Sequence, residues 1–175
     1  MAGKLPEGIF AGHCFKGGNG MEILATQDLL DQLEQIYRQY LEESEALFRK
    51  GNGFLHAVRS VLGTNTIKSS PIHQRFYDAV AQQVEQLTER LEQTADPLLA
   101  DQAVRLLMEE RPKGQDVTRY GWLSAAQTLA IPLLAYASRE TVEELYPIYC
   151  GAHPRRDRLP RQAELIKAME QRMQN

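Results

Sequence analysis

Cysteine is scarce in this chain of 175 residues, which contains only Cys14 and Cys150. Two thiols cannot form the disulfide framework of a small secreted protein, and they suit a reducing compartment. A signal peptide is also missing, because Gly, Lys, His and Asn interrupt every apolar stretch in the first twenty residues. These absences predict a cytoplasmic protein.

Sequence motifs for catalysis are missing as well. The chain has no phosphate-binding loop, dinucleotide fingerprint, nucleophile elbow or paired-histidine zinc motif. Neither His56 nor His73 has a glutamate three residues before it, as a di-iron helical bundle requires. We therefore predict no catalytic residue and no cofactor, and we favour a binding protein over an enzyme.

Metal-ligating residues are few. His13 and Cys14 are adjacent, and Cys150 precedes His153 by three positions, so four zinc ligands exist in principle. Adjacent ligands rarely fit one tetrahedron, and we therefore predict no metal site.

Composition places the chain among ordinary folded proteins. Hydrophobic residues make up 43% of the sequence and charged residues 25%, with a formal net charge of −3. The length of the chain is near the usual domain size of about 150 residues, which favours one domain. A chain of this length buries enough surface to fold without a disulfide or metal. The acidic balance argues against a surface built as a whole to bind nucleic acid.

The first twenty residues differ from the rest, because they are rich in glycine and have no helical or strand period. We expect residues 1–20 to form a mobile segment and residues 21–175 to form a single helical domain. Lys16-Gly17-Gly18 can be encoded by a purine run that resembles a bacterial ribosome-binding site, a few codons before Met21. Two alternatives stay open: a natural flexible tail, or a bacterial protein whose translation begins at Met21.

Apolar residues recur at spacings of three and four through most of the chain, as in amphipathic helices. The helical spacing is interrupted where Gly, Pro and polar residues cluster, and we expect loops or turns there. The fold class predicted is all-α: a single-domain bundle of about seven helices, with a short α-solenoid as the alternative. The expected helices cover residues 26–50, 54–62, 71–94, 97–110, 117–137, 139–149 and 160 onward.

Several helix ends have recognisable signals. Thr26, Ser70, Asp96 and Ser138 are expected N-caps, and proline follows two of them at the first helical position. Pro132 is expected to kink the helix over 117–137, and residues 151–159 are expected to form a loop. On the last helix, the residues expected to face inward are Ala163, Ile166, Met169 and Met173.

Residues 120–138 form a run of nineteen residues without a charged side chain. That length could span a membrane, but Gly, Ser, Gln, Thr and Pro lie inside it and alanine is frequent. We therefore predict the buried central helix of a bundle and no membrane association. Leu129, Leu133 and Leu134 should join the core, and Gln127 should need an internal hydrogen-bond partner.

A basic segment near the C-terminus is the one candidate functional patch. Arg155, Arg156, Arg158 and Arg161 lie close together in sequence, whereas residues 22–50 contain seven acids against three bases. Because aromatic residues for base stacking are absent from the segment, we favour either internal partners for these arginines, with the first helix as the expected location, or simple exposure of both charged segments to solvent. Nucleic-acid binding by residues 153–161 is the alternative.

The function expected from these observations is binding rather than catalysis, with a protein as partner; the oligomeric state is not encoded in any recognisable pattern. A nucleic-acid-binding regulator is one alternative. The other is an enzyme or ligand carrier with a pocket between helices, for which the tyrosines at 37, 40, 120, 146 and 149 are candidates. A deep pocket containing Tyr, His and Glu would favour this last alternative.

Intact-mass spectrometry of the protein from its natural source tests the translation start. The ribosome-binding-site interpretation predicts a dominant species that begins at Met21. A dominant species that begins at Met1 would contradict it and leave the flexible tail.

Overall fold

The structure is a computed structural model, and it describes residues 18–50, 70–111 and 117–174. These residues form six α-helices and two short 3₁₀ helices and contain no strand, so the predicted all-α class is confirmed. The predicted helix over 54–62 lies outside the described residues. The elements are α1 (Gly18–Lys50), α3 (Pro71–Thr94), α4 (Pro97–Met108), α5 (Val117–Gln127), η1 (Thr128–Ala135), α6 (Arg139–Ala152), η2 (Arg155–Asp157) and α7 (Pro160–Gln174).

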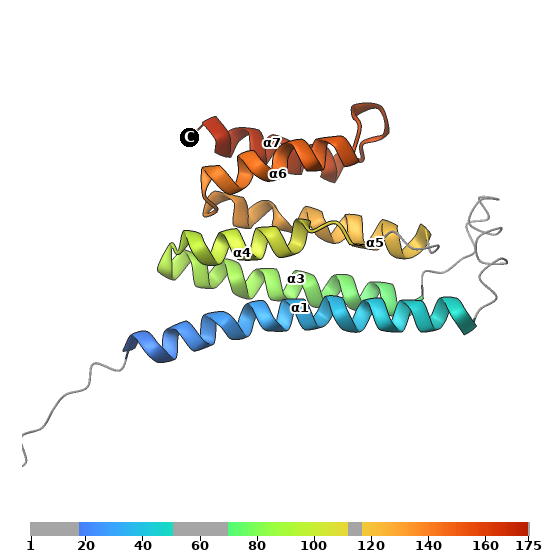
Figure 1. Ribbon diagram of the computed structural model, residues 1–175, viewed down its shortest axis with the longest axis horizontal. Helices are drawn as coiled ribbons and strands as arrows, with labels where there is room; N and C mark the ends of the chain where they lie inside the picture. Colours follow the sequence, from blue (N-terminus) through green and yellow to red (C-terminus); the bar gives the residue numbers. More distant parts are fainter. Residues whose placement is uncertain (1–17, 51–69, 112–116, 175) are drawn as a thin grey trace, which may run out of the picture.

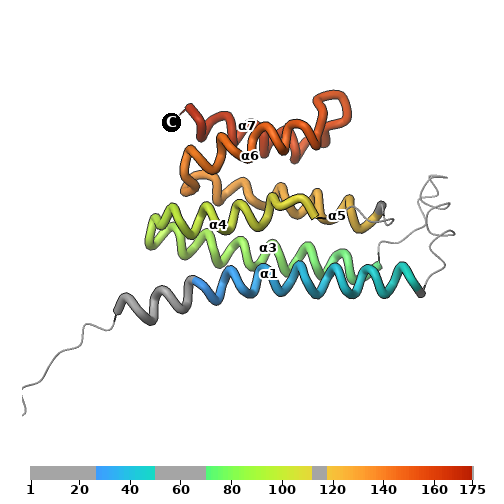
Figure 2. Tube along the Cα trace, in the orientation of Figure 1, coloured from blue at the N-terminus to red at the C-terminus, as the bar shows by residue number. Residues whose placement is uncertain are grey.

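The helices stack from α1 at one edge to α7 at the other, approximately in chain order (Figures 1 and 2). In a solenoid each repeat would contact only its neighbours. Here η1 packs against α3, α4 and α7, and α3 also contacts α5. The arrangement is therefore a bundle with η1 near its centre.

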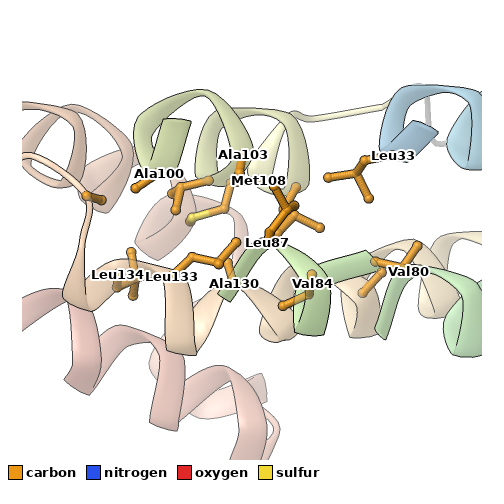
Figure 3. Packing of buried hydrophobic residues seen from close by; sticks show 14 of the residues in the cluster. Leu33, Val80, Val84, Leu87, Ala100, Ala103, Met108, Ala130, Leu133 and Leu134 are labelled. Carbon is orange, nitrogen blue, oxygen red and sulfur yellow. The ribbon is translucent and has the colours of Figure 1, made fainter. Parts of the chain in front are cut away.

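The core confirms the prediction of a buried, uncharged segment. Leu133 is fully buried and Leu134 is 2% exposed, while Leu129 packs against the core from its edge. Figure 3 shows side chains from α1, α3, α4 and η1 meeting here. Small residues let these backbones approach closely; they include Ala100, Ala103 and Ala130, each without exposed surface. No helix in the described parts of the chain is long and apolar enough to cross a membrane.

Of the four expected N-caps, Asp96 and Ser138 are confirmed, Ser70 holds the N-cap position without using its hydroxyl, and Thr26 is wrong because it lies inside α1. An Asp96 carboxylate oxygen accepts hydrogen bonds from the backbone N–H groups of Leu98 and Leu99, at 3.0 and 3.3 Å. The Ser138 hydroxyl accepts from the backbone N–H of Thr141 at 3.2 Å. The Ser70 side chain makes no such bond. Pro71 starts α3 without it, because the fixed φ of proline is already helical.

The first helix begins earlier than expected, at Gly18 instead of Thr26. The apolar period that guided the prediction begins only at Leu29, but residues 21–25 read Met-Glu-Ile-Leu-Ala and include strong helix formers. Residues 18–20 are thus helical and not part of an irregular segment. Residues 1–17 lie outside the described part of the chain.

Pro132 changes the helix type and not only its direction. The proline ring clashes with the carbonyl four residues before it, which belongs to Thr128, and proline has no N–H to donate. α-Helical geometry accordingly ends at Gln127, and residues Thr128–Ala135 tighten into η1. The prediction of one kinked helix over 117–137 is wrong in this respect.

The C-terminal region also differs from the sequence-based prediction. α6 passes Pro147 and continues to Ala152, and η2 replaces part of the loop expected over 151–159. On α7, Ala163 is exposed, whereas Gln162 and Leu165 are buried beside Ile166. Gln162 is stable inside because its amide donates to the Ser124 hydroxyl at 3.0 Å and accepts from the backbone N–H of Leu159 at 2.8 Å.

Shortening a central side chain tests the importance of η1. Leu133→Ala removes a fully buried side chain and should lower the free energy of unfolding by about 2–5 kcal/mol, measured by urea denaturation. The control is Leu98→Ala, at a leucine that is 64% exposed, where we expect a change below about 0.5 kcal/mol. Equal effects at both positions would contradict the assignment of the core.

Candidate functional site

The arginines of the basic segment do not pair with α1, so that prediction is wrong. Arg155, Arg156 and Arg161 are exposed. Arg156 contacts its neighbour Asp157 at 3.0 Å, and Arg161 contacts Glu164 at 2.9 Å. The pairs are local because these exposed side chains find a carboxylate within one helical turn.

The Arg158 side chain binds the backbone just after α6. Its Nε and Nη2 atoms donate to the backbone carbonyl of His153 at 3.3 and 3.1 Å. This carbonyl follows the last turn of α6, where carbonyl groups lack helical partners. Arg158 therefore holds the end of α6 through two of its nitrogen atoms.

The acidic residues of α1 likewise have nearby partners. Glu34 pairs with Arg38 and Glu45 with Arg49, at 2.9 and 2.6 Å along the same helix. Glu43 reaches Arg75 of α3 at 3.2 Å. These exposed pairs contribute little to stability. They show that acidic side chains of α1 pair with nearby basic residues and not with the basic segment.

A groove of about 650 Å³ lies between α3 and η1. We call it the α3/η1 groove. Apolar side chains from both elements line it together with glutamates of α3. The apolar lining comes from Tyr77, Ala81, Val84, Leu129, Ile131 and Pro132; Glu85, Glu89 and Glu92 supply the acidic side, and Thr88, Thr128 and Arg161 complete it.

The acidic side of the groove carries uncompensated charge. Glu85, Glu89 and Glu92 are spaced by four and three residues, which places them on one stripe of α3. All three are exposed, and none pairs with a basic side chain of the described residues. Arg161 also lines the groove, but Glu164 already neutralises it. The groove therefore combines apolar surface with net negative charge.

A second, much smaller hollow lies where α1, the end of α4, α5 and the end of α6 meet. We call it the Tyr37 cavity; its volume is about 30 Å³. It combines the three residue types expected of an inter-helix pocket, since Tyr37, Glu109 and His153 all line it. The other lining residues are Leu107, Glu110, Arg111, Tyr120, Leu123, Ser124, Gln127 and Ala152. Gln127 donates to the carbonyl of Met108 at 3.4 Å, so it has the internal partner that was predicted.

The five tyrosines proposed as pocket residues do not converge on one site. Tyr37 and Tyr120 both line the Tyr37 cavity. Tyr40 stacks on Phe76, with its hydroxyl 2.8 Å from Nδ1 of His73, and belongs to the core. Two others, Tyr146 and Tyr149, lie on α6.

The tyrosines of α6 have different surroundings. Tyr146 lies at the surface and donates a hydrogen bond to Glu170 at 2.8 Å, which together with a bond to Cys150 raises the pKa of Tyr146 to about 12. Burial raises the pKa of Tyr149 well above its ordinary value. Burial does the same for Tyr37, although the nearby Arg111 opposes that increase in pKa. All three remain neutral phenols near neutral pH.

No group of three or more metal-ligating side chains occurs among residues 18–50, 70–111 and 117–174. His13 and Cys14 lie outside these ranges. No protein-family model, curated protein or solved structure matches this chain. Inferences about function therefore depend on the geometry of the chain itself.

Removing arginines one group at a time tests these assignments. Arg155→Ala combined with Arg156→Ala should change the free energy of unfolding by less than about 0.5 kcal/mol, because both side chains are exposed. Arg158→Ala should cost about 1 kcal/mol, because the His153 carbonyl loses its charged donor. Urea denaturation measures both, and a larger effect of the double variant would contradict the local pairing.

Proposed function

We propose that this protein binds another protein, by accepting a basic amphipathic helix of the partner in the α3/η1 groove. The observation that carries the proposal is a groove of about 650 Å³ that combines apolar side chains with three glutamates lacking a basic partner among the described residues. Helix-in-groove recognition requires both an apolar floor and a charge pattern along the edge.

The apolar part of the groove would supply most of the affinity. Leu129 and Ile131 from η1 are only partly buried, and Pro132 is exposed. Covering such surface is favourable by about 25 cal/mol per Å². A partner that presents leucine or a similar side chain to this floor would remove it from water.

The acidic side would set the charge and direction of the partner. Tyr77 to Glu92 on α3 spans about 24 Å at the helical rise of 1.5 Å per residue, so a helix of about four turns fits beside it. Lysine or arginine at matching spacings would lie opposite Glu85, Glu89 and Glu92. Electrostatic complementarity of this kind adds mainly specificity and a faster association rate.

The residue types in the groove support binding over catalysis. Its lining contains no histidine, cysteine or lysine, and its three glutamates are exposed to solvent, so none of these side chains has the partner or the burial that activates a nucleophile or a base. The cytoplasmic location of the partner is inferred from the sequence of the whole chain and not from the groove. The chain has only two cysteines, which suits a reducing compartment.

The nucleic-acid alternative has less support. The glutamates of the α3/η1 groove would repel phosphates. Of the four arginines in the basic segment, Arg156 and Arg161 pair with neighbouring acids, and Arg158 holds a backbone carbonyl. Three of the four positive charges are thus already engaged within the chain.

A designed peptide tests the proposal without a known partner. The probe is a fluorescent helix of about 16 residues, with leucine on one face and lysine at positions i, i+4 and i+7 of another. We expect saturable binding by fluorescence anisotropy, weaker at about 300 mM salt than at about 50 mM because salt screens exposed charges. Glu85→Gln combined with Glu89→Gln should weaken binding several-fold.

The control variant is Glu42→Gln combined with Glu140→Gln, which removes the same charge from exposed residues outside the groove. It should bind the peptide like the natural protein. Ile131→Asp should abolish binding by charging the floor. Equal loss in both double variants would indicate attraction to overall charge alone, and no saturation below about 100 µM peptide would overturn the proposal.

A further inference from the structure

The charges that line the α3/η1 groove are unevenly distributed along its length. On α3 the lining begins at Tyr77 and ends at Glu92, and we name the two ends of the groove after these residues. Glu85, Glu89 and Glu92 all lie in the half of this stretch that is nearer to Glu92. The glutamates therefore make the Glu92 end of the groove negative.

α3 and the chain that leads from α5 into η1 run in the same direction along the groove. The Tyr77 ring packs edge-on against Trp122 of α5, with 5.9 Å between the ring centres. Further along, Figure 3 shows residues 80–87 of α3 and residues 130–134 of η1 advancing in one direction, and the two elements are in contact. The Tyr77 end of the groove therefore lies beside α5, and the Glu92 end lies beside η1.

Arg161 of α7 lines the groove toward its Tyr77 end. The next residue, Gln162, donates a hydrogen bond to the Ser124 hydroxyl at 3.0 Å. Ser124 follows Trp122, the partner of Tyr77, by two residues. Because consecutive Cα atoms are only about 3.8 Å apart, the Arg161 side chain begins beside this same part of α5. The groove thus has a positive side chain toward one end and negative side chains toward the other.

The Arg161 side chain can accept a new partner. Its Nη1 atom contacts Glu164 at 2.9 Å, and the two side chains are 72% and 56% exposed. An ion pair this exposed is weak, because water solvates both charges well. A guanidinium also has further N–H groups beyond the one that this contact uses. A carboxylate or carbonyl group of a bound molecule can therefore bind Arg161 beside Glu164 or in its place.

These end charges distinguish the two directions in which a helix can lie in the groove. An α-helix has partial positive charge at its N-terminus and partial negative charge at its C-terminus. Antiparallel to α3, a bound helix has its N-terminus near Glu92 and its C-terminus near Arg161, and both contacts are attractive. Parallel to α3, both contacts are repulsive.

We propose that the α3/η1 groove selects the direction of its partner helix, which binds antiparallel to α3 with its carboxyl-terminal end at Arg161. This inference rests on the proposed function, because it specifies the partner of the same groove. The partner then has its basic residues in its N-terminal half, opposite the glutamates. Arg161 is the residue that determines this specificity.

The direction also changes the expected spacing of the basic residues. An antiparallel partner meets Glu92, Glu89 and Glu85 in that order, so its lysines match at positions i, i+3 and i+7. A parallel partner matches at i, i+4 and i+7. The difference is about 1.5 Å of helical rise, which a flexible lysine side chain spans. Spacing alone therefore does not decide the direction, and the charges at the two ends do.

Two fluorescent peptides of identical composition and about 16 residues test the proposal. Both have a leucine face, an acetylated N-terminus and a free C-terminal carboxylate. The first has lysines at i, i+3 and i+7 in its N-terminal half, and the second has them at i, i+4 and i+7 in its C-terminal half. A hydrocarbon staple on the outward face keeps both helical, so that intrinsic helicity does not differ. By fluorescence anisotropy, we expect the first peptide to bind about 10-fold more tightly, because both of its ends meet opposite charge.

Variants test the role of Arg161 in this preference. Arg161→Gln should reduce the difference between the two peptides to about 3-fold or less, because one of the two end contacts loses its charge. Amidation of the C-terminus of the first peptide should have a similar effect. The control is Arg155→Gln, which removes an exposed arginine that does not line the groove and should leave the difference unchanged.

Photo-crosslinking reads the direction itself. A benzophenone at the C-terminus of the first peptide should crosslink to the Tyr77 end of the groove, and one at its N-terminus to the Glu92 end, as located by mass spectrometry. The reverse pattern, or equal affinity of the two peptides, would overturn the proposed direction while leaving a groove that binds helices. Absence of saturable binding by either peptide, or crosslinks outside the groove, would overturn the proposed function as well.

Discussion

The packing of η1 in the middle of the bundle is the constraint on which the other features depend. Residues 128–135 contain no charged side chain, and they contact α3, α4 and α7 together. Leu133 and Ala130 fill the space between these helices without exposing any surface. Because Pro132 forces a 3₁₀ geometry, η1 turns with about three residues per turn, which gives its three sides different neighbours.

The α3/η1 groove follows from this geometry. Leu133 and Leu134 face the interior, so Ile131 and Pro132 remain near the surface beside α3. On α3, the stripe that faces the core is flanked by the stripe that carries Glu85 and Glu89. An apolar strip from one element thus meets an acidic strip from another. Neither strip alone would form a recognition surface.

Most ion pairs among the described residues join side chains that are close in sequence. Exposed arginines pair with acids one turn away, as Arg38 does with Glu34 and Arg161 with Glu164. The opposite net charges of the first helix and the C-terminal segment therefore do not imply contact between them. Counting charges over long segments overlooks this, because exposed charges are strongly screened and favour partners within reach of a single side chain.

What the sequence by itself determined is local: the helix over 71–94, the helix that begins at Pro97, the caps at Asp96 and Ser138, and the burial of Leu133. Each depends on hydrogen bonds or apolar spacing among residues a few positions apart. Tertiary structure alone decided that Arg111 lies over Tyr37, 4.0 Å from its ring centre, and that Ile131 lies beside α3. It also decided the rotation of α7 that buries Gln162 and exposes Ala163. These outcomes depend on how helices distant in sequence rotate and pack, and a helical period does not contain that information.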